Sequence, residues 1–163
     1  MRQLREAAEF VRRLRGRMRF GEFSRAPLRL LRLQIRGETA ECDWIARPPD
    51  EWDSELPSDV GERNASLQAI LDSMAMRELL FANLPEICGA ELRVFRRRGR
   101  EPPQLIITGE VTRDCPAILR VTSPVMRAKL FGFQFRLNDG LLVQLQTEEC
   151  DLELAAIKRS YRL

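Results

Sequence analysis

The residue types that most often carry out chemistry are absent or scattered in this chain of 163 residues. There is no histidine, which removes the commonest general base and the commonest zinc ligand. The four cysteines stand far apart along the chain, at Cys42, Cys88, Cys115 and Cys150. No stretch has the spacing of a phosphate-binding loop, a calcium loop, a nucleophile elbow or a metal site. We therefore expect neither a cofactor nor a metal, and the sequence favours a protein that is not an enzyme.

Two cysteines and one glutamate stand among apolar neighbours. Cys42 and Cys88 are expected to be small buried side chains, because their neighbours in the sequence are apolar. A nucleophilic role is not expected for any of the four cysteines, because a reactive thiol needs a cationic neighbour that lowers its pKa and no histidine is present. Glu78 falls near the middle of the apolar arc of a predicted long helix, where a buried carboxylate could serve in acid–base chemistry. The alternative that we favour is that the apolar stripe drifts along the helix, so that Glu78 reaches its edge or pairs with an arginine.

The densest positive charge lies between two predicted strands, where residues 96–100 read Arg-Arg-Arg-Gly-Arg. Four guanidinium groups at the tip of a hairpin could bind phosphates or an acidic partner. The alternative is an exposed tip whose charge only keeps the protein soluble. Phe95 is the one aromatic residue close by in the sequence, which weakens the case for a surface that stacks nucleic-acid bases.

The net charge of +3 conceals an uneven distribution of charge along the chain. Residues 1–36 and 93–136 are strongly basic, residues 37–92 are strongly acidic, and residues 137–163 are weakly acidic. Separate basic blocks would give a surface for an anionic partner. The alternative that we favour is that the basic and acidic blocks neutralise each other across the fold.

Residues 2–19 have the clearest helical pattern in the chain. Their apolar side chains recur at steps of three and four and form one stripe, and arginines occupy most of the other positions. We expect this stripe to cover the protein's own sheet, or to form the seam of a homodimer, or to lie on an acidic membrane surface, in that order of preference, with nucleic acid as a further alternative. The candidate partner-binding residues are Leu4, Val11, Leu14, Met18, Arg96, Arg97, Arg98 and Arg100.

A first hairpin is predicted around a type II′ turn at Gly37-Glu38, since that turn prefers glycine at its first position. One register gives an apolar face and a charge-matched face, which is what fixes the pairing of two strands. The apolar pairs are Ile35–Ala40, Leu33–Cys42 and Leu31–Trp44, and the polar pairs are Gln34–Glu41 and Arg32–Asp43.

The rest of the chain alternates between helices and hairpins. A long helix is expected from a cap at Ser58 to about residue 84, followed by strands at residues 90–95 and 105–112. A short helix is expected between Ser123 and Gly132. A last hairpin would turn through a three-residue loop at residues 138–140 that aligns Leu137 with Leu141, Phe135 with Val143 and Phe133 with Leu145.

These elements predict an α+β fold in one domain. A mostly antiparallel sheet of about six strands, built from three hairpins, would pack on the long helix, with further helices at both termini. Residues 1–20 would be a basic amphipathic extension, residues 28–146 the core, and residues 147–163 a C-terminal helix.

From the long helix to residue 145 the predicted order is helix, strand, strand, helix, strand, strand. This order resembles the BON domain, a small envelope-associated α+β module. The segment Leu105–Val111 is similar to the central strand of that family, and Gly132-Phe133 to the turn into its last strand. The resemblance covers about half of the chain and implies attachment to a membrane or a partner rather than catalysis. The chain departs from the family in having no signal-like start and in carrying a further helix and hairpin ahead of the similar part.

The function that these observations favour is a binding or assembly module that is not an enzyme and that self-associates as a homodimer. The alternative is an arginine-rich surface that binds an anion, either nucleic acid or acidic lipid. The first 25 residues lack the apolar stretch of a secretory signal, and no apolar run is long enough for a membrane span. We therefore expect the protein in the cytoplasm.

Overall fold

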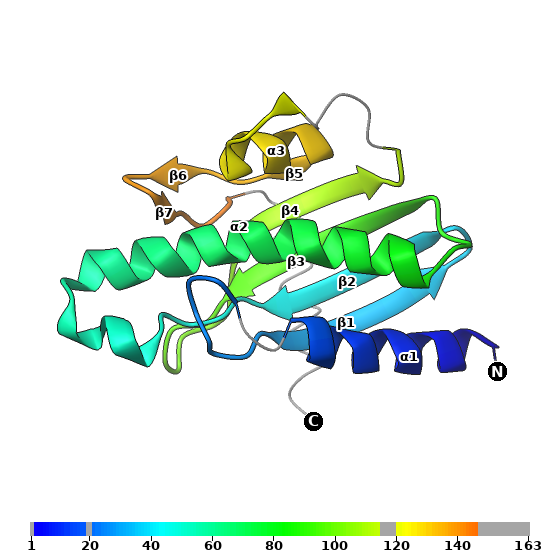
Figure 1. Ribbon diagram of the computed structural model, residues 1–163, viewed down its shortest axis with the longest axis horizontal. Coiled ribbons are helices and arrows are strands. Elements are labelled where there is room, and N and C mark those ends of the chain that lie inside the picture. The colour runs from blue at the N-terminus through cyan, green and yellow to red at the C-terminus, as the bar shows by residue number, and fades with distance from the viewer. Residues whose placement is uncertain (1, 19–20, 115–119, 147–163) are drawn as a thin grey trace.

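Three helices lie on one face of a twisted sheet in the computed structural model, which describes residues 2–18, 21–114 and 120–146 (Figure 1). The helices are α1 (Arg2–Arg17), the long α2 (Ser58–Asn83) and the short α3 (Pro124–Phe131). Buried side chains from all three helices form one apolar core with the inner face of the sheet. The α+β class predicted from the sequence is confirmed.

The main sheet has five strands in the order β1-β2-β3-β4-β5. The strands are β1 (Arg29–Arg36), β2 (Thr39–Ile45), β3 (Gly89–Arg96), β4 (Gln104–Thr112) and β5 (Phe133–Gln134). All neighbours run antiparallel except β2 and β3, which are parallel because α2 carries the chain back between them. Two short strands, β6 (Leu137–Asn138) and β7 (Leu141–Leu142), form a separate pair. The three predicted hairpins are present as β1–β2, β3–β4 and β6–β7, but the described residues form seven strands rather than about six, and the third hairpin lies outside the main sheet.

The first hairpin has the predicted register over most of its length. Ile35 lies opposite Ala40, and Gly37 begins the turn with a φ of 59°. Beyond Arg32 the register shifts by one residue, so that Leu30 rather than Leu31 lies opposite Trp44. The prediction was wrong at this one pair because a bulge adds a residue to one strand and turns its side chain to the other face.

The outer face of the sheet carries charged side chains that pair with one another. The Nε and Nη2 atoms of Arg93 donate to the two carboxylate oxygens of Asp43, each at 2.9 Å. The Nη1 atom of Arg32 lies 4.0 Å from the same carboxylate, and Arg98 forms a further ion pair with Glu62 at 2.9 Å. These contacts join basic segments to the acidic one, which supports neutralisation between the charge blocks.

The apolar stripe of α1 packs on the protein's own core. Phe10, Leu14 and Met18 are buried in the main cluster. At the surface, the Nη1 atom of Arg13 donates to Oδ1 of Asn83, near the end of α2, at 2.6 Å. The N-terminal helix is therefore part of the same core as the long helix and the sheet.

The last hairpin turns through two residues rather than the predicted three. Asp139 and Gly140 both have positive φ values, 51° and 78°, as a type I′ turn requires. Leu137 therefore pairs with Leu142, so the predicted pair with Leu141 was wrong. The shorter turn also places Leu142 in the core, where its N–H donates to Oγ of Ser66 at 3.1 Å.

The predicted ends of α3 are confirmed, whereas the predicted cap of α2 was wrong. Ser123 caps α3 by accepting from the Met126 N–H, and Gly132 ends the helix with a φ of 108°. For α2 the capping residue is Pro57, with no side-chain hydrogen bond, and Ser58 is the first helical residue instead of the predicted cap. The predicted C-terminal helix at residues 147–163 lies outside the described residues.

The two described cysteines differ in exposure. Cys42 is buried in the sheet, and burial raises the pKa of its thiol, so the thiolate does not form at neutral pH. Cys88 is exposed, which contradicts the prediction that it is buried. Its backbone N–H donates to the Glu38 carbonyl at 2.7 Å. This hydrogen bond fixes the backbone just before the first residue of β3, while the side chain remains exposed. Cys115 and Cys150 lie outside the described residues.

Candidate interaction surface

The most exposed large apolar side chain in the described part of the chain is Trp52, which is 81% exposed. It lies on the short helix η1 (Glu51–Glu55), before the start of α2. The carboxylate of Asp50 caps η1 by accepting from the Trp52 N–H at 3.1 Å. Asp53 packs beside Gly61 of α2, where an added Cβ would lie 3.2 Å from the Asp53 Cβ. Trp52 is therefore held outward by a fixed turn.

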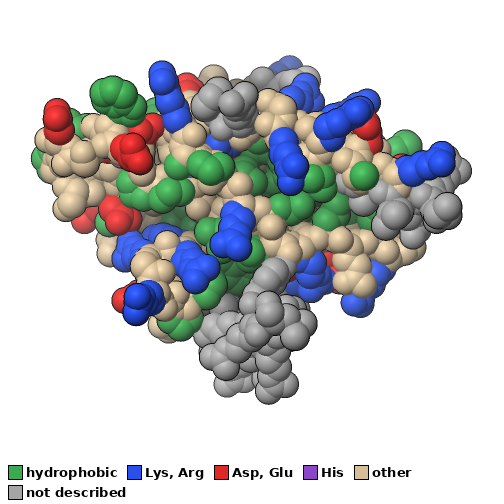
Figure 2. Space-filling model, turned by 90° about the horizontal axis from the view of Figure 1, so that it is seen from below, with side chains coloured by type: hydrophobic (Ala, Val, Ile, Leu, Met, Phe, Trp, Pro, Cys, Tyr) green, Lys and Arg blue, Asp and Glu red, His purple; other side chains and the backbone are tan. Residues whose placement is uncertain are grey.

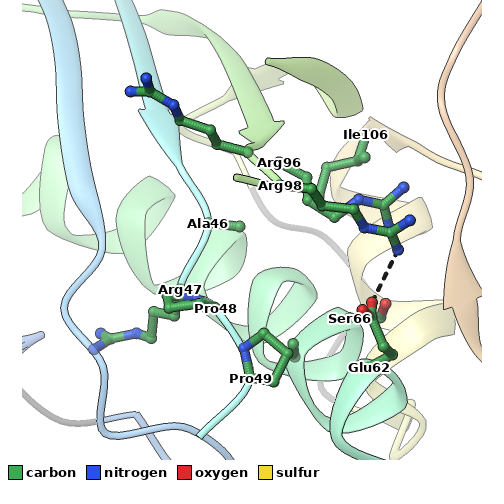
Figure 3. Close-up of a pocket in the computed structure, with 11 residues that line it drawn as sticks. Ala46, Arg47, Pro48, Pro49, Glu62, Ser66, Arg96, Arg98 and Ile106 are labelled. Atoms are coloured by element: carbon green, nitrogen blue, oxygen red, sulfur yellow. Dashed lines mark hydrogen bonds and ion pairs between the residues drawn. The ribbon is translucent and has the colours of Figure 1, made fainter. Parts of the chain in front are cut away.

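The four arginines of the hairpin tip differ in exposure, since Arg96 is partly buried and the other three are exposed. The Nη1 atom of Arg96 donates to the Leu142 carbonyl at 2.6 Å, and Nη2 donates to Oε1 of Gln104 at 3.2 Å. Burial, followed by repulsion from Arg98, lowers the pKa of Arg96. Arg97, Arg98 and Arg100 are exposed. Figure 3 shows Arg98 reaching the Glu62 carboxylate on α2, 2.9 Å away.

Helix η1 and the arginine tip flank the first turns of α2. Asp53 of η1 touches Gly61, and Arg98 of the tip binds Glu62, the next residue of the helix. Figure 2 shows acidic and basic side chains close together at this end of the molecule. We call this region the η1–tip surface and define it by its exposed residues, which are Glu51, Trp52, Glu55, Leu56, Arg97, Arg98 and Arg100.

A small hollow lies beneath the tip, between the arginines and the segment that follows β2. Its volume is about 50 Å³, and its walls include Pro49, Glu62, Ser66 and Arg96 (Figure 3). Pockets for small-molecule substrates have volumes of roughly 300–1,000 Å³. The hollow is therefore too small for a substrate. A partner at this end of the molecule would contact the exposed side chains around the hollow.

A larger hollow runs along α1. Its volume is about 690 Å³, and its walls include Val11, Leu14 and Met18 of the predicted partner-binding set. Leu14 and Met18 are buried against the core, and Val11 is half-buried. The side chain of Leu4, the fourth predicted residue of this helix, lies outside the described residues.

The structure thus keeps the two predicted groups of partner-binding residues in separate regions, one along α1 and one at the tip. Sequence reasoning missed Trp52 and Leu56, because the stretch from residue 47 to residue 57 reads as a loop of prolines and acids. A tryptophan within such a polar loop was the available signal, since it has no core position to fill.

The residue considered for acid–base chemistry lies on the surface. Glu78 is exposed on α2 and lines neither hollow, so it is not the buried carboxylate that the hypothesis required. Within the described ranges, no three cysteine, aspartate or glutamate side chains gather as a metal site would need. Among the same residues, no helix is long and apolar enough to cross a membrane.

Comparison with known proteins gives no relative of this chain. No family model, no curated protein sequence and no solved structure matches it. The resemblance to the BON domain therefore finds no support. The protein therefore has an α+β fold, with a surface of apolar and charged side chains, the η1–tip surface, at one end.

Proposed function

We propose that this protein is a binding and assembly module that self-associates as a homodimer through the η1–tip surface. The main support for the proposal is that Trp52 is 81% exposed. It lies on a turn whose conformation is fixed by hydrogen bonds, so its outward position is defined. Tryptophan and arginine are the residue types most enriched at the energetic centres of protein interfaces. Here both types stand at the same end of α2.

The charges of this surface support a second copy as the partner. A two-fold interface brings the same patch of both copies together, so the patch must be complementary to itself. The η1–tip surface has an acidic half at Glu51 and Glu55 and a basic half at Arg97 and Arg100. A two-fold rotation would place each acidic half against the partner's basic half, with Trp52 near the middle.

A charge-exchange experiment tests the proposal by sedimentation equilibrium. The Arg97→Glu/Arg100→Glu variant and the Glu51→Arg/Glu55→Arg variant should each be monomeric, because each opposes like charges. Mixed in equal amounts, the two variants should form a heterodimer, since every opposed pair is then of opposite sign. Arg36→Glu and Glu38→Arg should leave the homodimer intact, because both residues are exposed beside the turn between β1 and β2, which lies at the end of the molecule opposite the start of α2 (Figure 1). Wild-type protein that stays monomeric at high concentration would refute the proposal.

The alternative is that the same arginines bind an anionic partner, either nucleic acid or the surface of an acidic lipid membrane. The exposure of Arg97, Arg98 and Arg100 at one tip supports this candidate, because clustered guanidinium groups attract an anion. Affinity for such a ligand falls steeply with salt. The Glu51→Arg/Glu55→Arg variant distinguishes the two functions, since it should strengthen binding to nucleic acid or to an acidic membrane while it prevents self-association.

A further inference from the structure

The hollow along α1 lies beside the free edge of the main sheet. Its walls come from the second half of α1 and from the start of β1, and its volume is about 690 Å³. Val11, Leu28 and Leu30 line it while only partly buried. In Figure 1, α1 lies below β1 and extends past the edge of the sheet. We call this hollow the α1–β1 groove.

The edge of β1 beside the groove is an open row of backbone groups. β1 is the first strand in the order of the sheet and pairs only with β2. In the part of the chain that the structure describes, no N–H or carbonyl group of Arg29–Arg36 forms a hydrogen bond outside this pairing. An unpaired strand edge is a template to which an extended segment of another chain can add as a further strand.

Two arginines at the groove have charges that are not neutralised. Arg15 of α1 and Arg29 of β1 are exposed, and neither forms a hydrogen bond or an ion pair with any described residue. Other arginines of the same two elements are paired with acids, namely Arg12 and Arg13 with Glu9, and Arg32 and Arg36 with Glu41. The groove therefore presents two guanidinium groups to an anionic ligand.

An apolar lining, an open strand edge and two cations together fit an extended acidic peptide. Successive side chains of a strand point to opposite faces, so a segment in which apolar and acidic residues alternate can bury one set and expose the other. Leu30 lies opposite the buried Trp44, so apolar side chains of an added strand would enter the groove beside Leu30. Figure 2 views the molecule from this side and shows apolar side chains between basic ones.

A second copy of β1 fits this edge less well than an acidic strand does. Antiparallel pairing of two copies of β1 over their full length would place Arg29 of one copy opposite Arg36 of the other. Like charges directly opposite each other destabilise a pair of strands, whereas opposite charges stabilise it. The edge therefore favours a partner strand that carries acids.

We propose that β1 accepts an extended acidic segment of a partner protein as an additional strand of the sheet. Its alternate apolar side chains enter the α1–β1 groove, and its acids lie beside Arg15 and Arg29. The groove residues of α1, from Val11 to Met18, cover about 10 Å along the helix axis. About four residues of a strand span this length, and two of them face the groove.

This proposal does not depend on self-association. The η1–tip surface and the α1–β1 groove share no residue, so a peptide can bind to either the monomer or the dimer.

Fluorescence anisotropy with a labelled acidic peptide tests the proposal in the full-length chain. The probe is a peptide of about ten residues in which glutamate and valine alternate, since a strand of this length covers β1. We expect one peptide to bind per chain. Arg15→Glu/Arg29→Glu should weaken binding at least tenfold, because the acids then meet like charges.

The matched control for charge is Arg5→Glu/Arg17→Glu. It makes the same change in net charge at two exposed positions of α1 that do not line the groove. This variant should bind the peptide within threefold of wild type. An equal loss of affinity in both double variants would overturn the proposal, since it would show that only the net charge matters.

The arginine tip is a competing site for an acidic peptide, so it needs its own control. Arg97→Glu/Arg100→Glu should leave the affinity for the peptide within threefold of wild type. A tenfold loss in this variant would place the peptide at the tip and overturn the proposal. Because the same variant removes the proposed dimer interface, it separates a failure of self-association from a failure of strand addition.

Methylation of the peptide backbone tests whether binding occurs by strand pairing. The peptide with every backbone nitrogen methylated keeps its side chains and loses every N–H donor, so its affinity should fall at least tenfold. Methylation of every second nitrogen leaves one hydrogen-bonding edge intact, because successive N–H groups point to opposite sides of a strand. At least one of the two alternate patterns should bind within threefold of the parent peptide. Equal affinity of the fully methylated and the parent peptide would contradict strand addition.

Discussion

Arg47 and the arginines of the hairpin tip have opposite surroundings. The side chain of Arg47 is only 1% exposed, and its Nε donates to Oδ2 of Asp72 at 2.8 Å. Its other nitrogens donate to the carbonyls of Ala26 at 2.9 Å and Met18 at 2.5 Å. Arg47 thus ties the end of α1 and the segment before β1 to the middle of α2. At the tip, Arg97 and Arg100 are exposed.

This comparison shows that the role of a guanidinium group depends on burial rather than on local charge density. A buried arginine must have its donors satisfied inside the fold, so it acts as a structural joint. An exposed arginine contributes little to stability and is available to a partner. We therefore expect the exposed arginines of the tip, Arg97 and Arg100, to contribute less to stability than Arg47.

Among the substitutions considered, we expect the largest effect on stability from replacing Arg47. Replacing it by methionine leaves the Asp72 carboxylate buried without its ion pair, and we expect a loss of about 3–5 kcal/mol in the free energy of unfolding. Urea denaturation would measure this loss. Arg47→Met/Asp72→Leu is the control, since removing both partners should recover much of the stability. A loss below about 1 kcal/mol for Arg47→Met would contradict the structural role.

The stability of the Arg47→Met variant should also depend on pH. Burial raises the pKa of Asp72, against the opposing effect of Arg47, and removing Arg47 raises it further. A carboxyl group whose pKa is raised in the folded state favours folding below its unfolded pKa of about 3.9, and this contribution is lost as pH rises through the folded pKa. The deficit of the variant relative to wild type should therefore be smaller at about pH 4 than at pH 7. A deficit that is equal at both values would contradict this.

Arg113 is intermediate between the two groups. Its guanidinium group is partly exposed, yet it donates to the carbonyls of Phe81, Leu84 and Ile87 at 2.8, 2.9 and 2.8 Å, where α2 ends. We expect Arg113→Ala to cost about 1.5 kcal/mol in thermal unfolding, because these carbonyls lose a charged donor. Arg113→Lys should recover only part of the loss, since one ammonium group cannot reproduce the planar fork. Full recovery by lysine would mean that charge alone acts here.

The smallest effect is expected at the ion pair between Arg98 and Glu62. Both side chains are partly solvated, with exposures of 48% and 34%. A double-mutant cycle with alanine at each position should give a coupling energy below about 1 kcal/mol. A coupling of several kcal/mol would place Arg98 with Arg47 as a structural joint and would weaken its assignment to the interaction surface.

Much of the fold could be predicted from local pattern, and the differences have physical causes. The polar pair Gln34–Glu41 was correct because only one register gives the hairpin an apolar and a charged face. The bulge near Leu31 was not predictable from the hairpin, because it depends on packing against Phe95 and Leu105, which are distant in the sequence. The exposure of Cys88 likewise depends on how the end of α2 meets β3.

The candidate surface was only half predictable. The arginines of the tip were evident from their density. Trp52 was not, because its outward position depends on the cap from Asp50 and on close packing between Asp53 and Gly61. That Trp52 and the tip lie at the same end depends on how α2 packs on the sheet, which brings Glu62 within 2.9 Å of Arg98 although the two segments are far apart in the chain.

The fluorescence of Trp52 as a function of protein concentration tests self-association through this surface most directly. Trp44 is fully buried, so the difference between wild type and Trp52→Phe reports on Trp52. We predict that this difference emission moves to shorter wavelength, and that its quenching by acrylamide falls, as concentration rises through the monomer–dimer transition seen by sedimentation. Trp52 emission that stays red-shifted and fully quenchable at every concentration would contradict the proposed interface.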